Sequence, residues 1–138
     1  MQNNYPIILA AKNGHLNIIR ELFSINRKCL FNKSYFNETA LIIATKNRYI
    51  EIVDFIIKIC CEDNTFSRDF INIPDRINRT ALHWACINGS SKIAELLCFN
   101  RGDLDIQDNK HKTPLMYAYE YGNYEVLHIL KKKMDNIN

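Results

Sequence analysis

Hydrophobic and polar positions alternate along this chain in four similar groups, and each group predicts a pair of short helices. In the third group, Leu82, Ala85 and Cys86 recur at spacings of three and four, so they share one face of a helix. Gly89 then predicts a turn, because glycine readily adopts the left-handed conformation that ends a helix. The apolar positions of residues 93–98 form the buried face of a second helix.

The first helix of each group is centred on an alanine, and these alanines are 34, 41 and 33 positions apart. A period in the low thirties predicts a stack of small units, which presents a surface rather than a catalytic cleft. We expect one domain over residues 1–138, because four such units use nearly the whole length. The expected units are residues 3–33, 34–74, 75–107 and 108–138.

The spacing of 41 predicts seven or eight additional residues in the second unit, and we place this insertion at about residues 60–69. Two interpretations stay open. A surface insertion is tolerated, because long loops cost little additional closure entropy. A binding role is the alternative, because Phe66 and Phe70 are apolar in an otherwise polar segment.

Two segments carry a resemblance to a known family. Asn78-Arg79-Thr80-Ala81-Leu82-His83-Trp84-Ala85 and Lys112-Thr113-Pro114-Leu115-Met116-Tyr117-Ala118 resemble the ankyrin repeat, whose phrase is roughly G-x-T-P-L-H-x-A. The resemblance covers about residues 3–133. It implies an all-α ankyrin-repeat solenoid of four helix-turn-helix units, joined by finger-like hairpin loops.

Two positions depart from the repeat. Arg48 stands where the other units have glycine, so we expect strain in its turn. Lys131 takes a position that is Phe23, Ile57 or Cys98 in the other units. A charge there suits a helix with no following neighbour, and we therefore expect a monomer.

The composition argues against a nucleic-acid-binding, membrane-spanning or secreted protein. It also indicates the cellular compartment. A net charge of +3 without a basic stripe gives no case for nucleic acid. No apolar run approaches the roughly 18 to 20 residues that span a membrane, and the N-terminus does not resemble a secretion signal. Five irregularly spaced cysteines favour a reducing compartment. We expect the cytoplasm or nucleus, or the host cytosol if the protein is an effector.

The chain offers little for catalysis. The adjacent Cys60 and Cys61 have no matching pair of ligands, so we expect no metal site. The repeat explains the other cysteines by packing, which argues against a nucleophile. A phosphate-binding G-x-x-x-x-G-K-[ST] loop is absent from the sequence. We therefore expect neither an enzyme nor a cofactor.

The resemblance implies binding of a protein partner through the finger tips and the exposed side of the first helices, which line a concave surface. Trp84 is the strongest candidate, because tryptophan is enriched at binding hot spots, although it could be partly buried between neighbouring helices. Tyr35 and Phe36 could likewise pack beneath the next finger. The expected partner-binding residues are Tyr35, Phe36, Glu38, Lys46, Arg76, Ile77, Arg79, Trp84, Ile87, Asn88, Asn109, Lys110, Lys112, Tyr117, Glu120 and Tyr121.

Basic residues outnumber acidic ones at the expected finger tips, which favours an acidic protein segment as the partner. The leading hypothesis is a non-catalytic interaction scaffold. Within it, residues 79–86 are similar to a segment of gankyrin-type proteasome assembly chaperones. A secreted or viral ankyrin effector, or the regulatory part of a larger enzyme, are the alternatives.

Overall fold

The computed structural model describes residues 5–62, 66–67 and 69–136. Within these ranges the chain forms eight α-helices and two short 3₁₀ helices, and no strand. In chain order they are α1 (Pro6–Lys12), α2 (Leu16–Ile25), η1 (Arg27–Phe31), α3 (Ala40–Lys46), α4 (Ile50–Glu62), η2 (Phe70–Asn72), α5 (Ala81–Asn88), α6 (Ser91–Cys98), α7 (Pro114–Glu120) and α8 (Tyr124–Asn136).

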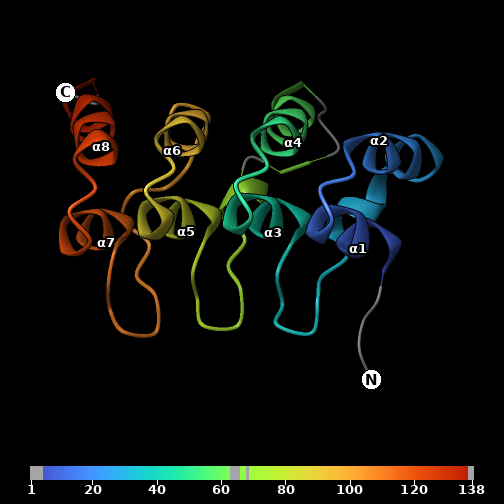
Figure 1. Cartoon of the computed structure of the whole chain (residues 1–138), viewed down its shortest axis with the longest axis horizontal. Coiled ribbons are helices and arrows are strands. Elements are labelled where there is room, and N and C mark those ends of the chain that lie inside the picture. The colour runs from blue at the N-terminus through green and yellow to red at the C-terminus, as the bar shows by residue number, and fades with distance from the viewer. Residues whose placement is uncertain (1–4, 63–65, 68, 137–138) are drawn as a thin grey trace.

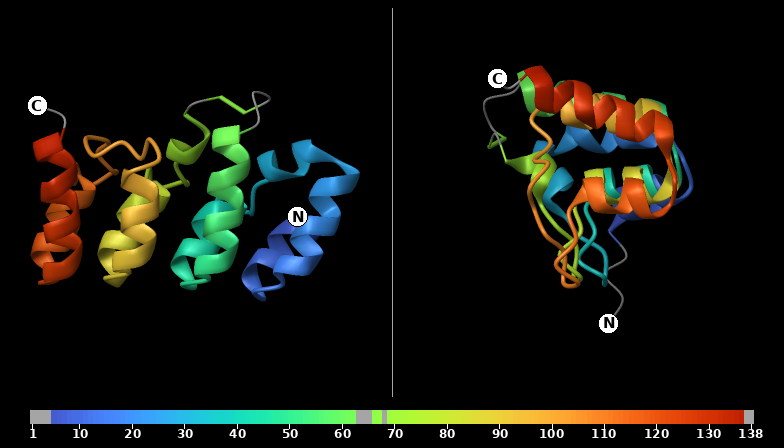
Figure 2. Two further views of the ribbon diagram at one scale, coloured as in Figure 1. Left: turned by 90° about the horizontal axis from the view of Figure 1, so that it is seen from above. Right: turned by 90° about the vertical axis from the view of Figure 1, so that its left-hand side faces the viewer.

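The helices form two parallel rows (Figure 1). One row contains α1, α3, α5 and α7, and the other contains α2, α4, α6 and α8. Three long loops extend from the first row in the same direction and line up as fingers, and the right-hand view of Figure 2 shows them superimposed. This is the helical solenoid expected from the repeat, with each helix pair stacked on its neighbours.

Threonine side chains cap the N-termini of three helices in the first row, α3, α5 and α7. The hydroxyl groups of Thr39, Thr80 and Thr113 accept hydrogen bonds from backbone N–H groups three residues later, at 3.2 to 3.4 Å. The alanine at the centre of each of these helices is buried, which allows neighbouring helices to approach closely. The first helix lacks this cap, because Tyr5 precedes Pro6 and its side chain forms no capping bond.

The inserted segment of the second unit differs from the polar loop that its sequence suggests. Its first residues, Cys60 to Glu62, still belong to α4, which is longer than α6 by more than a turn. Phe66 and Phe70 are both buried, so neither offers an apolar side chain to a partner. The Phe66 ring stacks on Phe31 at a centroid distance of 5.2 Å. Residues 63–65 and 68 of the expected insertion lie outside the described residues.

An aromatic cluster therefore forms between the first two units. Its members are Phe23, Phe31, Phe55, Phe66 and Phe70, whose neighbouring rings lie 5.2 to 6.4 Å apart. Aromatic rings at this separation attract one another in both stacked and edge-to-face arrangements. The insertion thus contributes two rings to the packing between α2, η1 and α4.

Candidate partner-binding surface

The three fingers share one construction. Asp75 accepts hydrogen bonds from the N–H groups of Ile77 and Arg79 at 3.1 and 2.9 Å. Asp108 does the same for Lys110 and Lys112 at 2.9 and 3.0 Å. These bonds hold each tip in a tight turn, so the residues on it have fixed directions.

The first finger uses a serine hydroxyl in place of that carboxylate. Ser34 accepts hydrogen bonds from the N–H groups of Phe36 and Glu38 at 3.2 and 3.1 Å. Each turn also places one residue in the left-handed conformation, with φ between 62° and 64° for Asn37, Asn78 and His111. Asparagine tolerates this conformation better than most residues do.

Backbone hydrogen bonds join the fingers to one another. The N–H of Arg76 donates to the carbonyl of Phe36, and the N–H of Asn109 donates to the carbonyl of Ile77, both at 3.0 Å. Arg76 also covers the Tyr35 ring, with its guanidinium carbon 4.6 Å from the ring centroid. The fingers therefore form a continuous edge rather than three separate loops.

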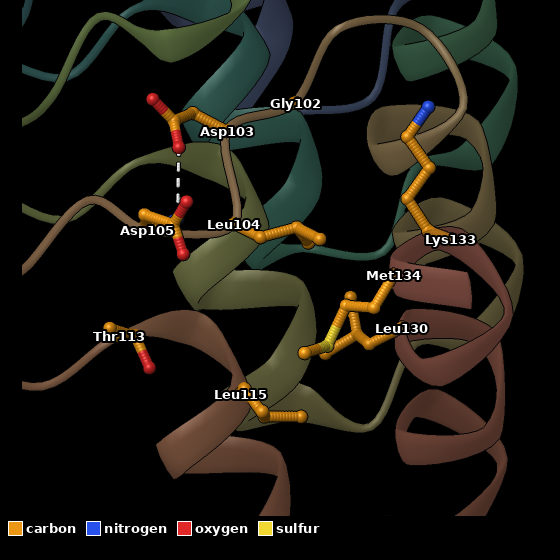
Figure 3. A pocket seen from close by; sticks show the side chains of 9 residues that line it. All are labelled: Gly102, Asp103, Leu104, Asp105, Thr113, Leu115, Leu130, Lys133 and Met134. Atoms are coloured by element: carbon orange, nitrogen blue, oxygen red, sulfur yellow. Dashed lines mark hydrogen bonds between the residues drawn. The ribbon is translucent and has the colours of Figure 1, made fainter. Parts of the chain in front are cut away.

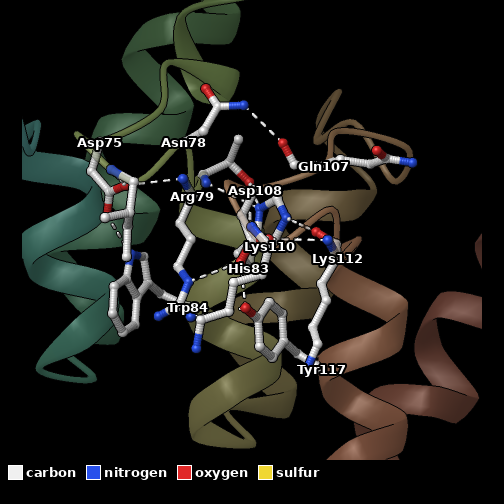
Figure 4. A network of polar contacts seen from close by, with 12 residues as sticks. Asp75, Asn78, Arg79, His83, Trp84, Gln107, Asp108, Lys110, Lys112 and Tyr117 are labelled. Carbon is white, nitrogen blue, oxygen red and sulfur yellow. Dashed lines mark hydrogen bonds and ion pairs between the residues drawn. The ribbon is translucent and has the colours of Figure 1, made fainter.

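Cations and aromatic rings alternate where the fingers meet the first row of helices, with Lys46, Trp84 and Tyr117 on α3, α5 and α7. The Lys46 ammonium lies 4.6 Å from the centroid of the Trp84 ring. The Arg79 guanidinium lies 4.9 Å from both Trp84 and Tyr117, and the Lys112 ammonium lies 5.4 Å from Tyr117. Each contact is within the distance at which a cation is attracted to a ring face. We call these five residues the cation–aromatic row, and Figure 4 labels Trp84, Arg79, Tyr117 and Lys112 of this row.

Carboxylates fix the cation–aromatic row from beneath. Glu38 pairs with Lys46 at 2.6 Å, and Asp75 accepts a hydrogen bond from the Trp84 indole at 2.9 Å. Asp108 pairs with Nε of Arg79 at 3.2 Å and accepts a hydrogen bond from the Tyr117 hydroxyl. These three carboxylates are buried, whereas Lys112 pairs at 2.6 Å with Glu120, which is exposed.

The environment of Asp108 strongly favours its ionised form. Burial alone would raise its pKa, but hydrogen bonds from Tyr117, the backbone of Lys112, Arg79 and the backbone of Lys110 outweigh that effect. The pKa of Asp108 is lowered to about 2. The Asp108 carboxylate is therefore charged at physiological pH, where it pairs with Arg79.

His83 links two units beneath this row. Its Nδ1 accepts a hydrogen bond from the N–H of Thr80 at 3.1 Å, and its Nε2 donates to the carbonyl of Lys112 at 3.0 Å. Both bonds require a neutral ring with its proton on Nε2. Burial lowers the pKa of His83, and the nearby Arg79 charge acts in the same direction. His83 is therefore a structural residue that ties the third finger to α5.

The structure divides the expected partner-binding residues into three groups. Glu38 and Tyr117 are buried, at 6% and 2% exposure, so the expectation that they offer side chains to a partner is not met. They support the surface instead. The half-buried residues are Arg79, Trp84, Ile87, Asn88 and Lys112. The exposed residues are Tyr35, Phe36, Lys46, Arg76, Ile77, Asn109, Lys110, Glu120 and Tyr121.

Sequence reasoning did not assign the roles of the buried carboxylates Asp75 and Asp108. The clue is positional, because each aspartate stands five residues before the threonine that caps the next helix, Thr80 or Thr113. Carboxylates at that fixed spacing indicate a repeated structural hydrogen bond.

No three His, Cys, Asp or Glu side chains come together as a metal ion would require, within the ranges that the structure describes. None of the described helices is long and apolar enough to cross a membrane.

The repeated architecture agrees with the sequence family. A family model described as ankyrin repeats, in three copies, matches residues 1–69 and again residues 60–138. The chain belongs to the ankyrin-repeat family. Ankyrin repeats mediate protein–protein interactions.

Two curated relatives align with most of this chain. The chain is 29% identical over 130 residues to the probable 26S proteasome regulatory subunit p28 of Saccharomyces cerevisiae, an alignment that covers 93% of this chain and 54% of the yeast protein. It is 27% identical over 151 residues to the putative ankyrin repeat protein FPV022 of fowlpox virus, covering 94% of this chain and 25% of the viral protein. The chain therefore spans about half of the first relative and a quarter of the second.

A solved ankyrin-repeat structure is also similar over nearly its whole length. The match is to a chain in the crystal structure of the yeast ribosomal protein Rps3 in complex with its chaperone Yar1, in which Yar1 is the ankyrin-repeat protein. The TM-score is 0.82 and the identity is 31%, over 91% of this chain and 89% of the matching chain.

Proposed function

We propose that this ankyrin-repeat chain is a non-catalytic scaffold that binds a protein partner through its concave surface. In this proposal the domain spans residues 1–138 and is a monomer when no partner is present. The partner contacts the finger tips and the exposed side of the first helices. The observation that carries the proposal is the cation–aromatic row, in which buried carboxylates hold Lys46, Trp84, Arg79 and Tyr117 and the exposed Glu120 holds Lys112.

Preorganisation favours binding, because side chains that are already fixed lose little entropy when a partner arrives. Trp84 illustrates this point. Its indole is held by Asp75 and flanked by Lys46 and Arg79, yet the side chain stays half-exposed. Aromatic and arginine side chains that are fixed in this way are typical of binding hot spots.

The charge distribution favours an acidic segment of the partner. Arg76 and Lys110 are exposed at the finger tips, whereas Glu38, Asp75 and Asp108 are buried below them. A partner carboxylate approaching the tips therefore meets the cations first. Complementary charge raises the association rate and selects against basic partners.

The test reverses two exposed charges and leaves the buried carboxylates and the residues that they hold unchanged. Immobilised wild-type protein and an Arg76→Glu/Lys110→Glu variant are incubated with lysate from the source cells, and retained proteins are identified by mass spectrometry. We expect a retained partner to bind the variant at least about tenfold more weakly in a subsequent titration. The difference should shrink at high salt, because surface charges are then screened.

The matched control is Lys92→Glu/Lys132→Glu, which changes the net charge equally on the second row of helices, where both lysines are exposed. Circular dichroism confirms that each variant is folded. The proposal fails if both variants lose the partner equally, or if the finger-tip variant keeps it.

A chaperone-type role is the second candidate, and it is favoured by the similarity to Yar1 over 91% of the chain. In this role the scaffold would hold a subunit before it is assembled. Purified yeast Rps3 is a direct probe, with turbidity as the measure of its aggregation. Suppression by wild type that is lost in Arg76→Glu/Lys110→Glu supports the role, and equal aggregation with and without the wild-type chain rejects it.

We place the protein in a reducing compartment, the cytoplasm or the nucleus. Cys86 and Cys98 are buried and behave as small apolar core residues. Burial raises the pKa of Cys98 to about 11 and that of Cys86 still further. Both thiols therefore stay protonated and unreactive at neutral pH.

A further inference from the structure

The last turns of the four first-row helices carry charge in a fixed order. The residue two positions after the central alanine lies in the last turn of each helix, and in chain order it is Lys12, Lys46, Ile87 and Glu120. The order is therefore cation, cation, apolar residue and anion. We call these four residues the helix-end line.

The helix ends lie side by side in the same order as in the sequence (Figure 1). Hydrogen bonds between neighbouring units hold them there. The Asn88 side chain donates to the carbonyl of Lys46 at 3.1 Å, which joins the ends of α5 and α3. The Asn123 side chain, just after α7, donates to the carbonyl of Cys86 on α5 at 2.6 Å. The charge order is therefore a fixed property of the surface.

Two ion pairs show that the helix-end line faces the fingers. Lys46 pairs with Glu38, eight positions earlier, at 2.6 Å, and Glu120 pairs with Lys112, also eight positions earlier, at 2.6 Å. The two pairs occupy equivalent positions with opposite sign. In the second unit the helix carries the cation, and in the fourth unit the helix carries the anion.

The third unit has no such pair. Its finger residue, Arg79, pairs with Asp108 of the next unit, and its helix residue is Ile87. Ile87 lies three positions after Trp84 on α5, so the two side chains share one face, and both are half-buried. The middle of the helix-end line is therefore apolar and lies between two charged ends.

Helix stability accounts for the lysines of this line but not for the glutamate. The C-terminus of a helix carries partial negative charge, which favours Lys12 and Lys46 and disfavours a carboxylate at Glu120, the last residue of α7. Lys112 binds one carboxylate oxygen of Glu120, and the glutamate side chain remains 49% exposed. Glu120 can therefore accept a further cation from outside the chain.

The two ends of the line attract different ions. Next to α1 and α3, Lys12 and Arg48 are exposed, and neither forms an ion pair in the part of the chain that the structure describes. At the other end, Tyr121 follows Glu120 directly, is 56% exposed and stacks on Tyr117 with 14° between the ring planes. A carboxylate beside an exposed ring is a combination that attracts arginine.

The spacing of the helices sets the length of a segment that reaches both ends. Packed helices lie about 8–10 Å apart, so the three steps from α1 to α7 cover about 27 Å. An extended chain rises about 3.3 Å per residue, so about eight or nine residues span this distance. Each helix end then meets roughly every third residue of the segment.

We propose that this surface recognises an extended partner segment with a defined order of charge. Its carboxylates lie at α1 and α3, a large apolar residue lies at Trp84 and Ile87, and an arginine lies at Glu120 and Tyr121. This proposal rests on the scaffold function proposed above and deepens it, because it states which end of the segment lies on which unit.

The probe is a pair of capped nonapeptides that differ in one charge. The arginine peptide is Glu-Ser-Ser-Glu-Ser-Leu-Ser-Ser-Arg, and the glutamate peptide ends in glutamate instead. Each is also made in reversed order, because the charge order does not fix the N-to-C direction, and the direction that binds more tightly is used.

Each peptide is titrated at low salt into the ¹⁵N-labelled chain and followed by amide shifts. We expect saturable shifts at residues 12, 46–48, 84–88 and 120–121, with a Kd of about 1 mM or tighter for the arginine peptide. The glutamate peptide should bind at least about threefold more weakly, because it places a like charge at Glu120.

The variant Glu120→Lys tests the order directly. We expect it to bind the glutamate peptide at least about threefold more tightly than the arginine peptide, which reverses the preference of the wild type. Glu125→Lys is the matched control, because it makes the same change of charge in the same unit at an exposed position of α8. It should keep the wild-type preference, and the amide spectrum of each variant checks that it is folded.

Three results would overturn the proposal. The first is equal binding of the two peptides by the wild type, or an unchanged preference in folded Glu120→Lys. The second is the same reversal in Glu125→Lys. The third is the absence of saturable shifts, or shifts confined to the hollow that residues 102–105 form with Leu130 and Met134 (Figure 3).

Failure of the charge order is distinguishable from failure of the scaffold function. The scaffold function depends on a partner that the wild type retains and the Arg76→Glu/Lys110→Glu variant loses. A partner lost in that variant but bound equally well by wild type and Glu120→Lys would reject the charge order and leave the scaffold function standing.

Discussion

Arg48 holds a backbone conformation that glycine holds in the other three units, with φ of 61°. A residue with a Cβ atom costs on the order of 1 kcal/mol there. The structure adds a compensating contact, because the Arg48 guanidinium donates a hydrogen bond to the carbonyl of Asn88 at 2.6 Å. This contact joins the second unit to the third at the surface.

Arg48→Gly and Arg48→Ala separate these two effects. Both variants lose the hydrogen bond to Asn88, but only the glycine variant relieves the backbone strain at position 48. We expect Arg48→Gly to be more stable than Arg48→Ala by about 1 kcal/mol in urea unfolding, and slightly more stable than wild type. Equal stability of the two variants would show that the turn carries no strain.

His83 predicts a pH dependence of stability. In the folded chain the pKa of His83 lies below its ordinary value of 6.5. Below pH 6.5 the unfolded chain therefore binds a proton at His83 before the folded chain does. Stability is therefore lost as the pH falls from 6.5 toward the lower folded pKa. Urea unfolding of wild type and His83→Gln at pH 7.5 and 5.5 checks this. The wild type should lose more stability than the variant over this range, and a parallel loss would contradict the prediction.

At the scale of elements, the insertion in the second unit contributes buried side chains to the hydrophobic core. The Phe66 ring contacts Phe23, Phe31 and Phe70 and is almost fully buried. We expect Phe66→Ala to lower the free energy of unfolding by about 3 kcal/mol, because it opens a cavity in the aromatic cluster. Urea unfolding gives this quantity.

Phe36→Ala is the matched control, since Phe36 is 61% exposed at a finger tip. This variant should change stability by no more than about 0.5 kcal/mol. Similar losses for the two variants would mean that the insertion does not pack as the structure indicates.

Most of the helical elements could be predicted from the sequence, because each is encoded locally. A capping threonine, a central alanine and a turn residue recur with the period of the unit. Each favours a helix or a turn through its own local backbone, so distant residues are not needed to predict it. The burial of Tyr117 and of Phe66 could not be predicted in this way. Tyr117 is buried because Asp108 and Arg79, from two different fingers, converge on its hydroxyl. Phe66 is buried because rings from η1 and α2 surround it.

In the candidate site, too, some features follow from the local sequence and others depend on contacts between distant residues. The positions of the finger tips are implied by the resemblance to the ankyrin repeat, in which each tip precedes a helix start such as Thr80 or Thr113. The orientation of the side chains depends on contacts between units, such as the Arg79 guanidinium lying between Trp84 and Tyr117. Those contacts depend on how neighbouring units pack against each other, which the repeat pattern alone does not specify.

For the whole molecule, stability should vary from unit to unit, because each unit packs mainly against its immediate neighbours. Val126 in α8 and Val53 in α4 are both fully buried, so alanine at either site should cost about 2 kcal/mol locally. In the end unit this loss should open α7 and α8 while α3 to α6 stay protected. In α4 it should lower protection on both sides, because neighbouring units rest on that helix. Residue-resolved hydrogen exchange distinguishes the two patterns. Uniform loss of protection in both variants would instead mean that the four units open only as one cooperative body.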